Sequence, residues 1–201
     1  MGSIPSKEGV SVEKLSDEEL IYHFQEGDNN AYNEIVRRYK DRLINFVYRY
    51  VGSYDDSEDI VQDTLVKVYV SKHLYKEVAK FSTWIYTIAI NLAKTKVIKK
   101  QKYKVFSISA AYDDEDKDFD IKDEAYLPDV DANSKFQEAH IQKALGSIPE
   151  NYRKLVILRD VEEFSYEEIC EMTGLPMGTV KSRINRGREK LQQLLKDIYK
   201  E

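Results

Sequence analysis

Residues 165–191, "SYEEICEMTGLPMGTVKSRINRGREKL", contain two helix signals separated by a turn. Ser165 and, three residues later, Glu168 form a capping box, which predicts that "YEEICEMT" is a short helix. Gly174 permits the positive φ angle that ends such a helix, and a second helix is expected from about Met177. The stretch is therefore predicted to be a helix-turn-helix.

The second helix of this motif has an apolar side and a polar side. At 100° per residue, a narrow arc that is expected to face the core contains Val180, Ile184, Gly187 and Leu191. The polar side carries the hydroxyl of Ser182, the amide of Asn185 and the guanidinium of Arg186. Such groups suit base edges in a major groove, with flanking cations on phosphates. We predict binding to duplex DNA, and the alternative is a solvated surface face.

The composition describes a soluble, helical protein. The chain has 201 residues, of which 42% are hydrophobic and 33% charged, with only 8 Gly and 4 Pro. A single cysteine, Cys170, excludes an internal disulfide framework and suits a reducing compartment. No apolar run approaches the ~20 residues of a membrane helix, and no signal-peptide core is present. We expect a cytoplasmic protein.

The N-terminal half is predicted to fold as four helices. Residues 1–14 are expected to be a disordered tail, and residues 15–104 a helical domain. Ser16 and Glu19 form a capping box at the first helix, and Ser82 is expected to cap the fourth. The second helix has an apolar stripe, the third is expected from about Ser57, and the fourth is expected to be covered from two sides.

An acidic segment separates this half from the C-terminal one. Between Asp113 and Asp131 there are ten acidic residues and two lysines, so the segment has a net charge of −8. This is more negative than the net charge of the whole chain, which is −5. Repulsion between like charges and the lack of apolar groups predict a flexible linker over 105–133. Helices resume over 134–201, so the fold class is all-α, with two small helical domains.

The third and fourth helices carry further candidate surfaces. Asp59, Gln62 and Asp63 share one helical face, which is a solvated face, a docking surface or, least plausibly, a metal site. A lysine row without an acid between Asn91 and Lys104 would follow phosphates and make DNA affinity salt-dependent. Its members are Lys94, Lys96, Lys99, Lys100, Lys102 and Lys104.

The order of these parts resembles a bacterial sigma factor of the extracytoplasmic-function (ECF) class. The matching segments are "DSEDIVQDTLVKVY", "KFSTWIYTIAINLAKTKVIKK", the acidic linker and "ALGSIPENYRKLVILRDVEEFSYEEICEMTGLPMGTVKSRINRGREKL". The resemblance implies a sigma region 2 domain over 15–104 and a region 4 domain over 134–201. It implies a subunit that binds core RNA polymerase, recognises the −10 and −35 promoter elements and opens the duplex.

The resemblance also assigns residues to these tasks. Docking on the coiled coil of the beta-prime subunit falls to Asp59, Gln62 and Asp63. Contacts with the −10 element and the melted bases are expected from Tyr75, Phe81, Thr83, Trp84, Asn91, Lys94, Lys99 and Lys100. Contacts with the −35 element are expected from Thr179, Lys181, Ser182, Arg183, Asn185, Arg186 and Arg188.

Some of these assignments have alternatives. The aromatic residues either stack on unpaired bases or pack in the core, and for Trp84 we favour packing. Leu155, Val156 and Leu158 either pack within the bundle or meet the flap of the beta subunit. Ser82 and Thr95 stand where relatives often carry arginine and aspartate, and lysines replace common arginines, so bidentate contacts are fewer.

The expected partners are core RNA polymerase, through its beta and beta-prime subunits, promoter DNA and an anti-sigma factor. The acidic linker either enters the polymerase cleft or is only a tether. A helix-turn-helix regulator that binds DNA without being a polymerase subunit is the alternative function. Three scattered histidines (His23, His73 and His140) and the lack of a phosphate-binding loop argue against an enzyme. We expect no catalytic residue, metal, cofactor or small-molecule substrate.

Overall fold

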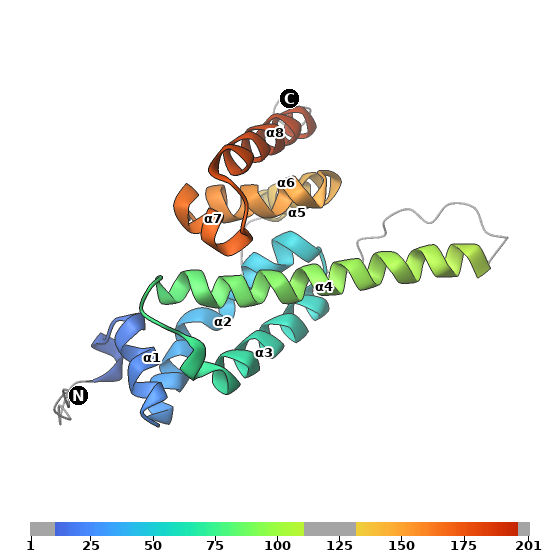
Figure 1. Cartoon of the computed structure of the whole chain (residues 1–201). Helices are drawn as coiled ribbons and strands as arrows, with labels where there is room; N and C mark the ends of the chain where they lie inside the picture. Colours follow the sequence, from blue (N-terminus) through green and yellow to red (C-terminus); the bar gives the residue numbers. More distant parts are fainter. Residues whose placement is uncertain (1–10, 111–131, 197–201) are drawn as a thin grey trace.

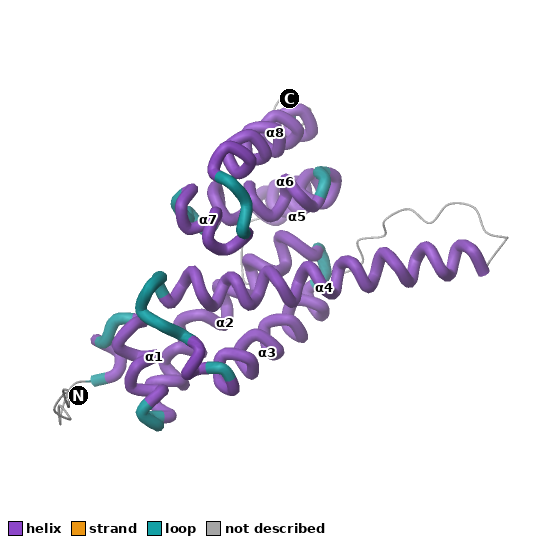
Figure 2. The backbone as a smooth tube through the Cα atoms, in the orientation of Figure 1, coloured by secondary structure: helices purple, strands orange, loops and turns teal. Residues whose placement is uncertain are grey.

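The computed structural model describes residues 11–110 and 132–196, with the backbone alone for 101–110 and 132–136. The described residues form two groups of helices and contain no strand (Figures 1 and 2). The first group comprises α1 (Asp17–Gln25), α2 (Asn29–Val51), α3 (Tyr54–Val70) and α4 (Phe81–Ala110). The second comprises α5 (Ala132–Ser147), α6 (Glu150–Val156), α7 (Tyr166–Thr173) and α8 (Met177–Leu195). The predicted all-α fold is confirmed.

The limits of the tail and of the linker differ from those expected. Residues Val12–Lys14 form a short 3₁₀ turn within the segment expected to be a tail. Helix α4 continues to Ala110 and α5 begins at Ala132, both inside the range expected for the linker. The acidic stretch 113–131 lies outside the described residues. None of the helices in the described ranges has an apolar stretch long enough to cross a bilayer.

Two helix starts show what local sequence does and does not specify. The predicted capping box at α1 is present, since Ser16 N donates to Glu19 Oε2 at 2.8 Å and Glu19 N to Ser16 Oγ at 3.2 Å. The prediction that Ser82 caps α4 is wrong. Helix α4 starts at Phe81, which places Ser82 inside the helix, and Glu18 of α1 accepts the hydrogen bond from Phe81 N at 3.0 Å. A carboxylate from another helix therefore satisfies this N-terminal donor.

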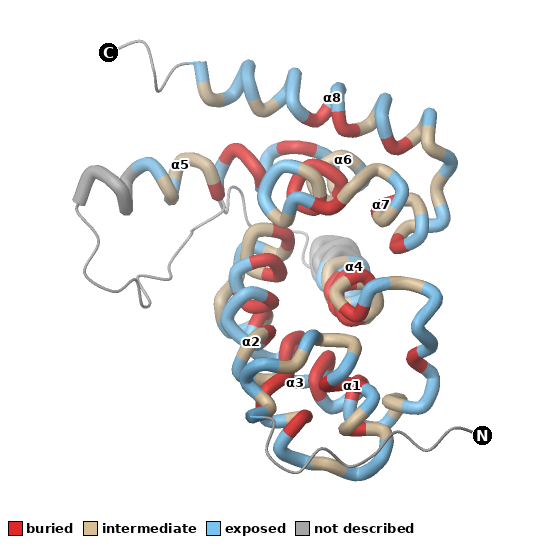
Figure 3. The backbone as a smooth tube through the Cα atoms, turned by 90° about the vertical axis from the view of Figure 1, so that its left-hand side faces the viewer, coloured by how far each residue is buried: buried red, intermediate tan, exposed pale blue. Residues whose placement is uncertain are grey.

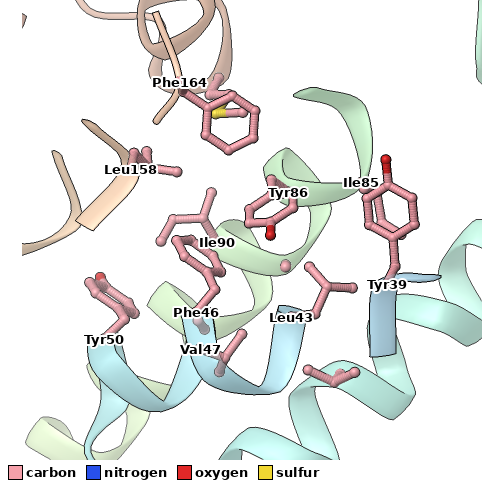
Figure 4. Packing of buried hydrophobic residues seen from close by; sticks show 14 of the residues in the cluster. Tyr39, Leu43, Phe46, Val47, Tyr50, Ile85, Tyr86, Ile90, Leu158 and Phe164 are labelled. Atoms are coloured by element: carbon pink, nitrogen blue, oxygen red, sulfur yellow. The ribbon is translucent and has the colours of Figure 1, made fainter. Parts of the chain in front are cut away.

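The core of the first group is built from all four helices, and Figure 4 shows the part between α2 and α4. Residues on one face of α2, at three- and four-residue spacing, pack against α4, and they are Tyr39, Leu43, Phe46, Val47 and Tyr50. From α4, Ile85, Tyr86 and Ile90 are buried. The opposite side of α4 meets the second group, so this helix is covered from two sides, as its two apolar faces predict.

The second group contains an irregular segment after its second helix, α6. Helix α6 ends at Val156 and passes into one turn of π-helix over Ile157–Val161. The chain then turns at Glu163, whose φ angle is +60°, and Arg159 Nη1 donates to Phe164 O at 2.8 Å. The apolar residues offered either to the bundle or to the polymerase are buried here, since Leu155, Val156 and Leu158 are at most 3% exposed.

The two groups pack directly on each other, with the second group seated on α2 and α4 (Figure 3). Phe164 is buried and meets Tyr86 of α4 edge to face, with ring centroids 5.0 Å apart. The Tyr86 hydroxyl donates to Glu162 at 2.6 Å. Lys80, just before α4, pairs with Glu168 of α7 at 2.9 Å. We call this contact between the two groups the seam.

The C-terminus of α2 is capped across the seam. The last carbonyls of a helix lack partners within it and carry a partial negative charge. Gln142 Nε2 of α5 donates to Tyr48 O at 2.9 Å, and Arg153 Nη1 of α6 donates to Tyr50 O at 2.8 Å. The Tyr50 hydroxyl donates to the carboxylate of Glu150. Backbone, side-chain and apolar contacts therefore join the two groups.

The first prediction concerns the close approach of α6 and α8 at Gly187. A Cβ atom there would lie 2.5 Å from Val156 Cγ2 and 3.3 Å from Tyr152 Cβ. We expect Gly187→Ala to lower the free energy of unfolding by about 1–3 kcal/mol, as overpacking does. Urea unfolding followed by circular dichroism measures it.

Gly178→Ala is the matched control, because a Cβ at this glycine of the same helix meets nothing within 4 Å. It should leave stability unchanged or raise it by up to ~1 kcal/mol through helix propensity. Equal stabilities for the two variants would contradict the close approach.

The second prediction concerns the seam. Phe164→Asp places a charge in its apolar centre, so we expect the two groups to separate and the radius of gyration in X-ray scattering to rise. Val161→Asp, at a neighbouring residue that is 42% exposed, is the control and should leave the radius unchanged. Helicity by circular dichroism separates opening from unfolding. A native helicity with an unchanged radius for Phe164→Asp would show that the seam does not hold the groups together.

Candidate nucleic-acid and partner interfaces

The helix-turn-helix has the geometry that its sequence predicts. The capping box at α7 is formed, with Ser165 N donating to Glu168 Oε2 at 2.8 Å and Glu168 N to Ser165 Oγ at 3.1 Å. Gly174 has a φ angle of +66° and ends α7, and α8 begins at Met177. The turn therefore fixes the direction of α8 relative to α7.

The two sides of α8 are divided as the 100° spacing indicates. Val180, Ile184 and Gly187 are buried against the bundle. The opposite side is solvent-exposed and carries Lys181, Ser182, Asn185, Arg186 and Glu189, flanked by the half-buried Thr179 and Arg183. Hydroxyl, amide and guanidinium groups are thus gathered on one accessible face near the start of a helix, which is the arrangement that a major groove admits.

Two of the cations on or beside this face already have partners. Arg188 forms a forked ion pair with Asp160, in which Nε lies 3.0 Å from Oδ2. The Lys181 ammonium lies 5.5 Å from the ring centroid of Tyr166, and the Arg159 guanidinium lies 4.9 Å from the same ring. Sequence reasoning missed Asp160, Arg159 and Tyr166, because no spacing rule relates them to α8. Tyr166, the first residue of α7, thus has a cation from each of two segments, Arg159 and Lys181, near its ring.

The lysine row of α4 is divided into two sets. Lys94 and Lys99 are exposed, and among the described residues neither lies within ion-pair distance of a carboxylate. Lys96 and Lys100 instead bond to Asp56 on α3, each with Nζ–O 3.2 Å. Asn91 is exposed one turn before Lys94. The side chains of Lys102 and Lys104 are not described.

The aromatic residues expected near the −10 element form a cluster of their own. Tyr75, Phe81 and Trp84 lie within 5.9 Å of one another by ring centroids, and Tyr39 closes the cluster edge to face on Phe81 at 5.4 Å. Tyr75 is 7% and Phe81 0% exposed, while Trp84 is half-buried. In this conformation the rings serve as packing, and bases have no access to Phe81.

Two polar groups, the hydroxyls of Thr83 and Tyr75, lie in the same region as these rings. Thr83 is also buried, and its hydroxyl has no hydrogen-bond partner among the described residues. Burial, aided by the charges of Glu18 and Glu77, raises the pKa of Tyr75 to about 12, so this phenol stays neutral. The exposed large apolar residues of the loop before α4 are Leu74 and Val78, at 74% and 90%. They were not singled out from the sequence.

The α1 helix fastens this loop at its base. Gln25 Nε2 donates to Lys72 O at 2.7 Å and to Tyr75 O at 3.2 Å. Lys72 Nζ in turn donates to Phe24 O at 2.6 Å. The loop is therefore held at one end by α1 and at the other by the aromatic cluster.

The face of α3 offered for docking is accessible. Asp59, Gln62 and Asp63 are all exposed, and the same side continues into the apolar residues Val66, Tyr69 and Val70. Exposed apolar side chains next to carboxylates are typical of a surface that a partner covers. In the described residues no group of histidine, cysteine, aspartate and glutamate side chains has a metal-binding arrangement.

Lys154 on α6 lies near one cation of α4 and one cation of α8. Burial lowers the pKa of Lys154 on α6, and the positive charges of Lys94 on α4 and Arg183 on α8 lower it further. Cations from three helices therefore repel one another there. An anion that reached this point would relieve the repulsion.

Comparisons with known proteins cover both helical groups. Residues 35–103 match the profile of Sigma-70 region 2, and residues 139–191 match that of Sigma-70, region 4. The chain is 34% identical over 179 residues to the ECF RNA polymerase sigma factor SigW of Bacillus subtilis, covering 89% of this chain and 96% of that protein. It is 32% identical over 192 residues to the ECF RNA polymerase sigma-E factor of Haemophilus influenzae, covering 93% and 99%.

Solved structures agree on the fold. The sigma factor RpoE of Bartonella quintana, solved in complex with the anti-sigma factor NepR, is 25% identical with a TM-score of 0.63, covering 82% of this chain and 96% of that one. CnrH, solved in complex with the cytosolic domain of CnrY, is 20% identical with a TM-score of 0.66, covering 90% and 97%. Because the relatives match α1–α4 as well as the helix-turn-helix, the alternative of a regulator that is not a polymerase subunit is not supported.

Proposed function

The chain belongs to the ECF RNA polymerase sigma factors, and on that premise we propose how its surfaces divide the work of initiation. Helices α1–α4 form the region 2 domain and α5–α8 the region 4 domain. In this proposal α3 docks on core polymerase, α4 and the loop before it engage the −10 element, and α8 reads the −35 element. The observation that carries the proposal is the exposed polar face of α8, which follows the capping box of α7 and the turn at Gly174.

Reading by α8 follows from its side chains. Arg186 and Asn185 have the donors and acceptors for base edges, while Lys181, Arg183 and Arg188 suit the flanking phosphates. Ser182 and Thr179 complete the expected set. The exposure of this face in the free chain means that region 4 needs no internal rearrangement to enter a major groove.

For the −10 element, burial changes the division of roles. We assign direct phosphate contact to Lys94 and Lys99 and base contact to Asn91 and the exposed loop between Lys72 and Lys80. Tyr75, Phe81, Thr83 and Trp84 then act by holding that loop and the start of α4, since they pack on one another. A rigid platform lowers the cost of capturing an unstacked base.

Promoter binding also requires the seam to open. The −35 and −10 elements lie about 25 base pairs apart, or about 85 Å at 3.4 Å per base pair. A compact chain of this length has a radius of gyration of only about 17 Å. With α4 and α8 on one packed body, the chain cannot reach both elements at once, so region 4 must separate from region 2 on the promoter.

The remaining assignments follow from the family. Polymerase supplies the catalysis, and the chain supplies no catalytic group, so we assign it to the cytoplasm with its polymerase. The RpoE relative binds the anti-sigma factor NepR. We accordingly expect an anti-sigma factor to cover the docking face of α3 or to stabilise the closed seam.

The third prediction tests docking. Asp63→Ala removes an exposed carboxylate from the centre of the α3 face, and we expect core binding to weaken at least about fivefold, or about 1 kcal/mol. Titration of fluorescent chain with bacterial core polymerase measures it. Asp41→Ala, which removes an exposed carboxylate from α2, should bind as wild type. Equal affinities for the two variants would remove α3 from the interface.

The fourth prediction tests reading of the −35 element. Arg186→Ala should relax selectivity at one base pair of the upstream element by about 1–3 kcal/mol. In vitro transcription with core polymerase on a pool of genomic fragments, followed by sequencing of the 5′ ends, gives the promoter set. Lys40→Ala, an exposed cation lost from α2, is the control. The same upstream preference in both variants would contradict the role of Arg186.

A further inference from the structure

Three ion pairs tie α3 to the lysine row of α4. The helices run antiparallel side by side (Figure 1), so an early residue of α3 faces a late one of α4. Asp56 Oδ1 lies 3.2 Å from Lys96 Nζ, and Asp56 Oδ2 lies 3.2 Å from Lys100 Nζ. One turn later, Asp59 Oδ2 lies 3.5 Å from Lys96 Nζ. One carboxylate thus bridges two lysines, and a second shares one of them.

The bridged lysines belong to the row that faces DNA. Lys96 and Lys100 alternate along α4 with Lys94 and Lys99, which stay exposed, and their own side chains are 42% and 62% exposed. A phosphate in solution could therefore reach Lys96 or Lys100. Only two of the four lysines are held by carboxylates.

Asp56 is well suited to hold them. Burial alone would raise its pKa, but the hydrogen bonds from Lys96 and Lys100 outweigh burial and hold the pKa of Asp56 below its usual value. The carboxylate is therefore ionised at neutral pH. It presents two anionic oxygens to two ammonium groups, as a backbone phosphate would.

We propose that Asp56 competes with promoter phosphates for Lys96 and Lys100, and so masks, in the free protein, two of the four α4 lysines whose side chains the structure describes. This inference rests on the proposed function, in which α4 binds DNA. Phosphates must displace Asp56 before Lys96 and Lys100 contribute. The free chain then binds DNA of any sequence more weakly than the number of its lysines implies.

Asp59 connects the mask to polymerase. Its carboxylate, 69% exposed, belongs to the docking face of α3 and also bonds Lys96. A polymerase cation that engages Asp59 draws it away from Lys96, which is then held by Asp56 alone and yields more readily to a phosphate. By linkage, core binding and DNA binding then favour each other.

The fifth prediction uses the full chain and a fluorescein-labelled duplex of about 20 base pairs, since phosphate affinity is independent of sequence. We expect Asp56→Asn to raise the affinity about threefold to tenfold at low salt, because two weak ion pairs no longer compete. Asp56→Glu keeps the charge and should bind as wild type. Anisotropy titrations over a range of salt concentrations measure these affinities, and the gain should shrink as salt screens the pairs.

Asp55→Asn is the matched control. Asp55 lies in the same first turn of α3 and loses the same charge, but among the described residues it has no lysine within ion-pair distance. The affinity of Asp55→Asn for the duplex should rise less than about twofold, because only the long-range effect of the lost charge remains. The gain of Asp56→Asn over Asp55→Asn should also vanish in a Lys96→Ala/Lys100→Ala background.

The Lys94→Ala variant separates failure of the Asp56 proposal from failure of the proposed DNA binding by α4. If Lys94→Ala weakens binding while Asp56→Asn matches Asp55→Asn, the mask is overturned and DNA binding by α4 stands. If Lys94→Ala has no effect, the role of α4 itself fails.

Should Asp56→Asn lose helicity, two double variants decide instead. Masked lysines predict that Lys96→Ala/Lys100→Ala loses less affinity than Lys94→Ala/Lys99→Ala. Equal losses would overturn the proposal.

Discussion

The buried tyrosines Tyr50 and Tyr86 impose the constraint on which the rest of the structure depends. A phenol ring can be buried favourably only if its hydroxyl finds a partner. Both hydroxyls find theirs across the seam, on Glu150 and Glu162. The first helical group therefore completes its core with polar groups of the second. Because those acceptors are carboxylates, which water also satisfies, the same contacts that close the seam allow it to open.

A similar arrangement of opposing groups recurs among the charged residues of the two helices that we propose to face DNA. On α4, Asp56 holds two lysines, and beside α8, Asp160 holds Arg188. In each case the acid comes from a neighbouring helix, and the cation it holds lies next to others that stay exposed. Exposed pairs of this kind are weak, so they order long side chains at little energetic cost and yield readily to a phosphate.

The sequence predicted those features that depend on neighbours within one or two helical turns. The capping boxes at Ser16 and Ser165, the turn at Gly174 and the buried side of α8 each require contacts three to seven residues apart, and each is confirmed. Ser82 failed as a cap because Glu18, from another helix, occupies the position. The aromatic cluster, the ion pairs of Asp56 and Asp160 and the seam join residues far apart in the chain, which periodicity does not relate.

The closed seam also contains a group that opposes closure, the buried carboxylate of Glu162. Glu162 accepts the Tyr86 hydrogen bond, but burial raises its pKa above the ordinary value despite that bond and nearby Arg42 and Arg49. A carboxyl whose pKa is raised in the folded state is stabilised there in its protonated form, so at neutral pH the ionised group works against closure. Packing of Phe164 on Tyr86 works in the other direction. The favourable apolar contacts of the closed seam are therefore set against the cost of a buried charge. A partner that binds one domain more tightly when the seam is open, or when it is closed, then needs only a modest difference in binding energy to shift the equilibrium between the two states.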